Sequence, residues 1–303
     1  MWNQLLDEII QGNQKSLARA ISLIENEVEG HADFLQKLPL GKTPVIGITG
    51  PPGAGKSTLV DALIGQWANE GKKVAVLCVD PSSPFNLGAL LGDRIRMSDW
   101  YNHPNVFIRS LATRGSLGGL HPHIIEITAL LQAAAFDYII VETVGVGQSE
   151  IEIAGLADVT IVVVVPEAGD EVQTMKAGLM EIADIFVVNK SDRPDADSFV
   201  RNLRMMLAPA FNGERKIPVL KTIASTKEGI DELCLAIKES EIAINNNDRK
   251  YWLMADRVYQ LIQRNKMKGI DKAAIKAAIG EAIQAPDFNL FNFTEQYLNE
   301  LKY

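Results

Sequence analysis

The stretch VIGITGPPGAGKSTLVDALIGQWANE, residues 45–70, contains the features that decide the fold. Its first five residues are mostly aliphatic and β-branched, as in a strand that is buried on both faces. GPPGAGKS, Gly50 to Ser57, then fits the pattern GxxxxGK[ST] at every fixed position, and a stretch with helical spacing follows. We therefore predict a strand, a phosphate-binding loop and a helix in that order.

The residue types in this loop suit a phosphate chain. Its negative oxygens need close backbone approach, inward-pointing amides and the positive end of a helix dipole. We expect Lys56 to neutralise the β and γ phosphates, Ser57 to complete magnesium coordination and Thr58 to lie near the α phosphate. The predicted nucleotide contacts are Gly50, Pro51, Pro52, Gly53, Ala54, Gly55, Lys56, Ser57 and Thr58.

Similar apolar runs recur between residues 45 and 224, and segments with helical period separate them. This alternation predicts an α/β fold with a doubly wound, mostly parallel, seven-stranded sheet, in which ligands bind at the carboxyl ends of the strands. The runs are VIGIT (45–49), VAVLCVD (74–80), VFIRS (106–110), YIIVET (138–143), VTIVVVV (159–165), IFVVNK (185–190) and PVLKTIA (218–224).

Both ends of the chain read as helical extensions. We expect a helical N-terminal extension over 1–40 with two helices, a nucleotide-binding domain over 41–240, and a helical arm over 241–303 with three helices. The arm could pack against the domain or form a dimer. Exposed aromatic residues on one of its helices, Tyr251, Trp252 and Tyr259, favour the dimer.

The motif NKSD, Asn189 to Asp192, ends the sixth apolar run and matches the guanine-recognition pattern NKxD. Asp192 can accept hydrogen bonds from the guanine ring NH and exocyclic amine, a donor pair that adenine lacks. Asn189 would tie this loop to the phosphate loop, and the Lys190 stem would lie along the base. These features predict GTP and GDP as ligands. At the next strand end, Ala224 and Ser225 offer either a backbone amide to the guanine oxygen or merely a polar strand end.

Two acidic strand ends, Asp80 and Glu142, point toward the γ phosphate. We assign Asp80 to magnesium or the attacking water, and Glu142 to magnesium through water. Asp80 could instead cap a turn, and Glu142 could pair with a surface base. The predicted catalytic residues are Lys56, Asp80 and Glu142, and the predicted Mg²⁺ ligands are Ser57, Asp80 and Glu142.

Composition excludes several function classes. A net charge of -8, a pI near 5.2 and the lack of a basic run argue against nucleic-acid binding. The longest aliphatic run, 159–165, is too short to cross a bilayer, and Asp7 and Glu8 do not suit a secretory signal, so we expect a soluble, cytoplasmic protein. Cys78 and Cys234 lack the spacing of a disulfide framework or a zinc site.

Six motifs together resemble the MeaB/ArgK-type GTPases of the SIMIBI class. Members of that family are chaperones for adenosylcobalamin-dependent acyl-CoA mutases, above all methylmalonyl-CoA mutase, and form homodimers through C-terminal helices. The resemblance therefore implies a mutase partner, with GTP and Mg²⁺ as cofactors. Older labels for the family, kinase or ATPase of lysine, arginine and ornithine transport, imply a weaker alternative. The motifs are GPPGAGKST, VDPSSPFNLGALLGDRIRM, TRGSLGGL, ETVGVGQSE, PEAGDEVQTMKAGLMEIAD and NKSD.

The resemblance also implies three switch segments. The first runs from Asp80 through Asp93 and Arg96, the second from Glu142 to Glu150 and the third over PEAGDEVQTMKAG, residues 166–178. From the residues alone, the third would be a solvated helical face. The implied switch residues are Asp93, Arg96, Gly145, Asp170, Gln173 and Lys176.

Two motifs depart from the family pattern. HPH, residues 121–123, could indicate a nickel-handling GTPase, but a proline separates the histidines and no cysteine or acidic cluster lies nearby in sequence, so we expect a solvated helix N-terminus. IAS replaces the usual SA pair, which puts Ser225 in doubt. Because spacing places no arginine or glutamine beside the attacking water, we also expect slow turnover by the protein alone.

Overall fold

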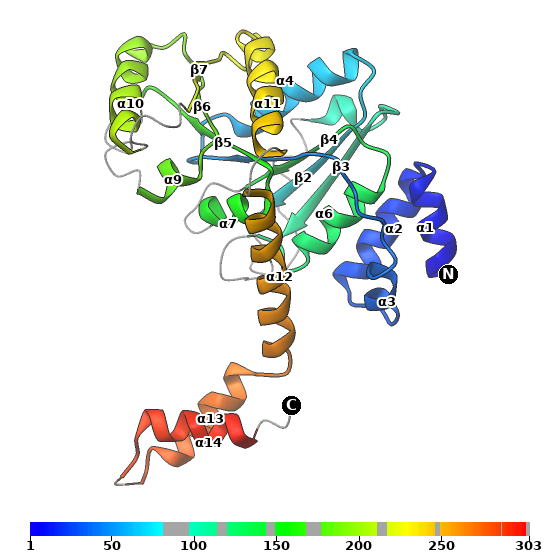
Figure 1. Ribbon diagram of the computed structural model, residues 1–303, viewed down its shortest axis with the longest axis vertical. Coiled ribbons are helices and arrows are strands. Elements are labelled where there is room, and N and C mark those ends of the chain that lie inside the picture. Colours follow the sequence, from blue (N-terminus) through cyan, green and yellow to red (C-terminus); the bar gives the residue numbers. More distant parts are fainter. Residues whose placement is uncertain are drawn as a thin grey trace. The chain divides into compact units, whose positions relative to one another are not determined.

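Seven strands form one sheet in the order β3-β2-β4-β1-β5-β6-β7 in the computed structural model, which describes residues 1–80, 97–113, 120–143, 149–167, 177–210, 217–245, 249–285 and 287–300 (Figure 1). Every strand pair is parallel. The predicted α/β fold is therefore confirmed, and the sheet is wholly rather than mostly parallel. The strands are β1 (Val45–Thr49), β2 (Val74–Asp80), β3 (Val106–Ala112), β4 (Tyr138–Glu142), β5 (Val159–Val164), β6 (Ile185–Val188) and β7 (Val219–Lys221).

Helices cover both faces of this sheet. Alternate strand residues point to opposite faces, so Ile46 and Ile48 pack with α4 and α11, whereas Val45 packs with α6, α7 and the N-terminal helices. A third cluster joins β5 and β6 to α9 and α10. In the core domain the helices are α4 (Lys56–Asn69), a 3-10 turn η1 (Ser98–Trp100), α6 (Ile124–Ala133), α7 (Ser149–Leu156), α9 (Ala177–Ile182), α10 (Ala196–Ala210) and α11 (Ile230–Asn245).

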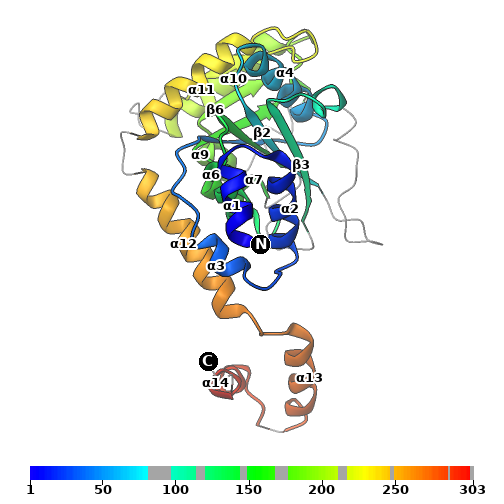
Figure 2. The ribbon, with the colours of Figure 1, turned by 90° about the vertical axis from the view of Figure 1, so that its right-hand side faces the viewer.

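The N-terminal extension has three helices, α1 (Trp2–Ile10), α2 (Gln14–Glu25) and α3 (His31–Leu35), where we expected two. α1 and α2 lie side by side, and α2 also packs on α6 (Figure 2). Leu17, Ile21, Ile24 and Phe34 are fully buried in the cluster that these helices share with the sheet. The extension is thus part of the hydrophobic core.

The C-terminal part consists of α12 (Arg249–Met267), α13 (Lys272–Ala282) and α14 (Leu290–Glu300), as predicted. The chain divides into two compact units, Met1–Met254 and Ala255–Tyr303. None of the described residues from 255 onward is buried. The second unit has no core of its own within the described residues.

The cysteines and the apolar character of the helices can also be compared with the sequence expectations. Cys78 is a fully buried thiol in β2, and Cys234 is a half-buried free thiol. In the part of the chain that the structure describes, we find no helix with the length and apolar character needed to span a bilayer.

Candidate nucleotide-binding site

The phosphate loop joins β1 to α4 in the middle of the sheet. The chain continues from β1 through α4 to β2 on one side, and later passes from β4 to β5 on the other side, so the loop lies where the strand order reverses. Ligands in open α/β sheets bind at this point, outside the carboxyl ends of the strands. The structure therefore places Gly50 to Ser57 where a nucleotide is expected.

Two glycines of the loop are required by close contacts. Gly50 and Gly55 have φ angles of +138° and +90°. A Cβ atom on Gly50 would lie 2.0 Å from the Val163 carbonyl oxygen, and one on Gly55 would lie 2.3 Å from Nδ2 of Asn189. Any side chain at either position would displace backbone or the base loop.

Lys56 begins α4 with its side chain directed back into the loop. Lys56 is 6% exposed, and its ammonium group donates hydrogen bonds to the carbonyl oxygens of Gly50, at 2.9 Å, and Pro51, at 3.1 Å. A cation held inside a loop at a helix N-terminus favours the binding of an anion. This geometry suits the predicted contact with the β and γ phosphates.

Two predicted metal ligands, Asp80 and Glu142, end adjacent strands, and the third, Ser57, lies in the first turn of α4. The Ser57 hydroxyl donates a 2.7 Å hydrogen bond to Oε1 of Glu142, and both side chains are buried. Asp80 ends the neighbouring strand β2 and is 3% exposed. Carboxylate and hydroxyl oxygens form a donor set that fits magnesium. An ion pair between Glu142 and a surface base does not fit a carboxylate that is only 3% exposed.

The base loop is tied to the phosphate loop through Asn189. Nδ2 of Asn189 donates to the Ala54 carbonyl oxygen at 2.9 Å, and its Oδ1 accepts from the Thr222 hydroxyl and the Ala224 backbone NH, both at 3.1 Å. Asn189 is 2% exposed. One side chain therefore joins the P-loop, β6 and the segment after β7, as the motif predicts. Because Ala224 donates its NH to Asn189, Ser225 is the better candidate for a contact with the guanine oxygen.

The remaining residues of the base loop are closer to solvent. Lys190 has a φ angle of +56°, and its Nζ donates to the Gly53 carbonyl oxygen at 2.8 Å, so its stem lies across the phosphate loop. Asp192 lies two residues further on, in an exposed turn. An ion pair joins the next residue, Arg193, to Glu167.

Three residues of this region, Thr222, Arg193 and Glu167, were assigned no role from the sequence. Thr222 completes the Asn189 network, and the Arg193–Glu167 ion pair supports the turn. Glu167 lies in the motif PEAGDEVQTMKAGLMEIAD but was assigned no role there, and Thr222 and Arg193 belong to none of the quoted motifs. Thr222 lies near the end of one predicted strand and Glu167 just after another, and only this could have suggested them, because the carboxyl ends of parallel strands meet at one end of a sheet.

The expectation that HPH, residues 121–123, is a solvated helix N-terminus is wrong. His121 and His123 are 1% and 8% exposed rather than solvated, because the N-terminal helices cover the start of α6. Nε2 of His121 lies 3.7 Å from Glu25, and the His123 ring lies 3.4 Å from Glu126. Acidic groups thus do approach HPH in space. Even so, no cluster of three or more His, Cys, Asp or Glu side chains with metal-binding geometry occurs among the described residues.

The implied switch residues Asp93, Arg96, Gly145, Asp170, Gln173 and Lys176 lie outside the described residues. Their roles stay predictions.

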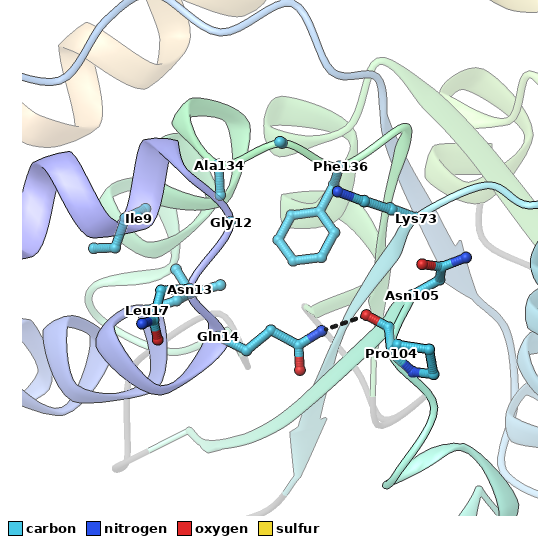
Figure 3. A pocket seen from close by; sticks show the side chains of 11 residues that line it. Ile9, Gly12, Asn13, Gln14, Leu17, Lys73, Pro104, Asn105, Ala134 and Phe136 are labelled. Carbon is cyan, nitrogen blue, oxygen red and sulfur yellow. Dashed lines mark hydrogen bonds between the residues drawn. The ribbon is translucent and has the colours of Figure 1, made fainter.

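A separate small cavity lies at the opposite edge of the sheet (Figure 3). Lys73, Asn105 and Phe136, which line it, precede β2, β3 and β4, and Gln14 crosses it to donate to the Pro104 carbonyl oxygen at 3.1 Å. Its volume of about 30 Å³ has room for about one water molecule. This cavity is therefore not a nucleotide site.

Comparisons with known proteins agree with this geometry. Residues 17–278 match the family model described as "Methylmalonyl Co-A mutase-associated GTPase MeaB". A relative from Pyrococcus abyssi, described as a "Putative GTPase", is 44% identical over 285 residues, and the match covers 92% of this chain and 88% of the relative. GTPase ArgK of Escherichia coli is 36% identical over 293 residues, covering 93% of this chain and 86% of ArgK.

A solved structure extends the similarity to three dimensions. The protein described as "LAO/AO transport system kinase" has 28% sequence identity and a TM-score of 0.69, and the match covers 100% of this chain and 98% of that chain. The matched residues include the phosphate loop, both acidic strand ends and the base loop. The chain thus belongs to the MeaB/ArgK family of GTPases.

Proposed function

We propose that the chain hydrolyses GTP to GDP and phosphate at this site, and that the nucleotide cycle controls cofactor loading and protection of an adenosylcobalamin-dependent acyl-CoA mutase. A methylmalonyl-CoA mutase is the client that the family model's description favours. The observation that carries the GTPase part is the buried Asn189 side chain, which links a base-reading loop to a phosphate loop.

The residues divide the chemistry between them. Lys56 binds the β and γ phosphate oxygens, and the loop amides hold the chain in line for attack. Ser57 and Asp80 would hold Mg²⁺, and Glu142 would hold it through a water molecule; the ion would neutralise charge on the transferred phosphoryl group. Asp192 reads the guanine edge, so the site selects GTP over ATP.

The position of the Ser57–Glu142 hydrogen bond supports coupling between the nucleotide state and a client protein. Glu142 ends β4, and the second switch implied by the family resemblance begins there. Magnesium and nucleotide binding at Ser57 would compete with this bond, so the nucleotide state would change the contacts of Glu142. A client that contacts this part of the chain could respond to that change.

The experiment compares GTP turnover and GDP affinity of the full chain with and without purified adenosylcobalamin-loaded methylmalonyl-CoA mutase. We expect slow turnover by the protein alone and a several-fold change when mutase is added. Ser57→Ala, which removes a proposed magnesium ligand, serves as the inactive control. Unchanged turnover and unchanged affinity in the presence of mutase would reject the client.

The solved relative described as a transport system kinase supplies a second candidate, phosphoryl transfer to a transport protein. Labelled γ-phosphate separates the two functions. Label that appears only in inorganic phosphate supports the GTPase, whereas label on a binding protein of lysine, arginine and ornithine transport, dependent on Lys56, supports the kinase.

We also propose that the C-terminal helices form a homodimer. Exposed apolar side chains on α12 include Trp252, Val258, Tyr259 and Ile262, each more than half exposed. From residue 255 onward none of the described residues is buried, so this helical segment gains little stability by itself, and burial against a second copy would supply a core. Light scattering should give a dimer mass for the wild type and a monomer mass for Tyr259→Glu. A monomeric wild type would contradict this proposal.

A further inference from the structure

The turn that carries Asp192 is anchored firmly at its start. Asn189 is buried and makes three hydrogen bonds, and the Arg193 backbone NH closes the turn on the Lys190 carbonyl oxygen at 3.1 Å. Asp192 itself lies on the exposed side of this turn. Its carboxylate can meet both donors of a guanine ring only if the turn keeps one orientation.

Arg193 ties the far end of the turn to a different strand. Its guanidinium group forms an ion pair with Glu167, which follows β5 by three residues. β5 and β6 are neighbours in the sheet, with Val164 opposite Val188. The ion pair thus joins the loops that leave two adjacent strands, at the edge where the nucleotide is expected.

Glu167 is charged at neutral pH. Desolvation acts to raise the pKa of Glu167, but hydrogen bonds from its own backbone and from Arg193, with the positive charges of Arg193 and Lys190, outweigh it and lower the pKa below its usual value. The pair is partly exposed, with 42% of the Arg193 side chain and 49% of the Glu167 side chain accessible.

The geometry points to Arg193 and Glu167 as positioning residues that set the guanine specificity of Asp192. This inference rests on the proposed function, because it takes Asp192 as the residue that reads the base. The ion pair restricts the turn before the nucleotide binds, so less conformational entropy is lost when Asp192 meets the base. Exposed ion pairs have small effects, so we expect changes of about two- to fivefold.

The ratio of the dissociation constants of inosine diphosphate and GDP is the appropriate measurement. Hypoxanthine lacks the exocyclic amine of guanine, so this ratio isolates the second hydrogen bond to Asp192 and is insensitive to the phosphate contacts. Arg193→Gln and Glu167→Gln should each lower the ratio by about two- to fivefold. The double variant should lower it no further, because either change breaks the same ion pair. The reversed pair, Glu167→Arg with Arg193→Glu, should restore part of the ratio.

The chain offers a matched control in the Lys221–Asp197 ion pair, which is also exposed and has an Nζ–Oδ1 distance of 2.9 Å. Asp197→Asn should leave the ratio unchanged. An unchanged ratio in both Arg193→Gln and Glu167→Gln, or additive losses in the double variant, would overturn the inference. Thermal unfolding shows whether each variant is folded. If Arg193→Gln is unfolded, the ratios of Glu167→Gln and of the reversed pair test the inference instead.

The same measurements separate this inference from the proposed function. If the wild type binds GDP no more tightly than ADP, the guanine assignment fails. If it prefers GDP but the ion-pair variants keep the wild-type ratio, only the positioning role fails.

Discussion

Replacing Asn189 with alanine tests the connection between the base loop and the phosphate loop. The change removes three hydrogen bonds and leaves the Ala54 carbonyl, the Thr222 hydroxyl and the Ala224 backbone NH without their partner. Asn189 and Thr222 are 2% and 1% exposed, so water reaches these groups poorly. The change should therefore lower both the stability of the protein and its affinity for GDP.

The size of the effect follows from the orphaned groups. Each buried polar group without a partner costs about 1–3 kcal/mol, and partial entry of water offsets some of this, so we expect Asn189→Ala to lower the free energy of unfolding by about 3 kcal/mol. Thr222→Val removes only one bond and should cost about 1 kcal/mol. In the double variant the orphaned Thr222 hydroxyl no longer exists, so the loss should fall about 1 kcal/mol short of additive.

Urea unfolding without nucleotide measures these free energies, and calorimetric titration measures GDP affinity, which we expect to fall about tenfold in Asn189→Ala. Phe199→Leu, in the α10 cluster away from the loop, is a control for general destabilisation and should leave GDP affinity unchanged. Fully additive losses in the double variant, or an Asn189→Ala loss below about 1 kcal/mol, would refute the reasoning.

Three further predictions follow from single groups. Burial, and next the charge of Asp158, raise the pKa of Glu241 to about 7, against the opposing charge of Lys238. The contribution of protonated Glu241 to the free energy of unfolding is therefore complete below the unfolded pKa near 4.5, and it is lost as pH rises through about 7. Glu241→Gln should raise the free energy of unfolding at pH 8.5 by about 1 kcal/mol, allowing for solvent screening, and by nothing at pH 4.5; equal effects at both pH values in urea unfolding would contradict this. Asp192→Asn should weaken GDP binding about a hundredfold and strengthen binding of xanthosine diphosphate, as measured by competition; unchanged GDP affinity would remove the base assignment. Ser57→Ala should abolish the Mg²⁺ dependence of GTP affinity in a magnesium titration, and a retained dependence would place the ion elsewhere.

The sheet and the phosphate loop could be predicted because their signals are local. A parallel strand covered on both faces is a continuous aliphatic run, and the described β1 and β2 have the predicted bounds of 45–49 and 74–80. The run 218–224 gave only the three-residue strand β7. The Thr222 backbone NH still donates to the Val188 carbonyl oxygen, and its hydroxyl donates to Asn189. The Asn189 tie was predictable from a motif, whereas the Thr222 bond to it was not.

The errors concern contacts between distant parts of the sequence. HPH looked like a solvated helix start because the residues that cover it, including Glu25, lie about a hundred positions earlier in the chain. The five-residue helix α3 is too short for a periodic signal to appear. The Arg193–Glu167 ion pair spans two loops, and the direction of a loop side chain depends on turns that residue spacing does not specify.

The two predicted ligand motifs act on one loop from opposite sides. Glu142 reaches the end of the phosphate loop from β4, and Asn189 reaches its middle from β6. In the sheet, β4 and β6 lie on either side of β1, separated from each other by β1 and β5. Magnesium coordination at Ser57 and the position of the base loop therefore both affect the backbone of the phosphate loop. We expect variants on one side to alter binding on the other, so that Asn189→Ala also shifts the magnesium concentration needed for GTP binding. Ser57→Ala would in turn change GDP affinity even without magnesium, and unchanged values in both titrations would show that the two sides of the loop act independently.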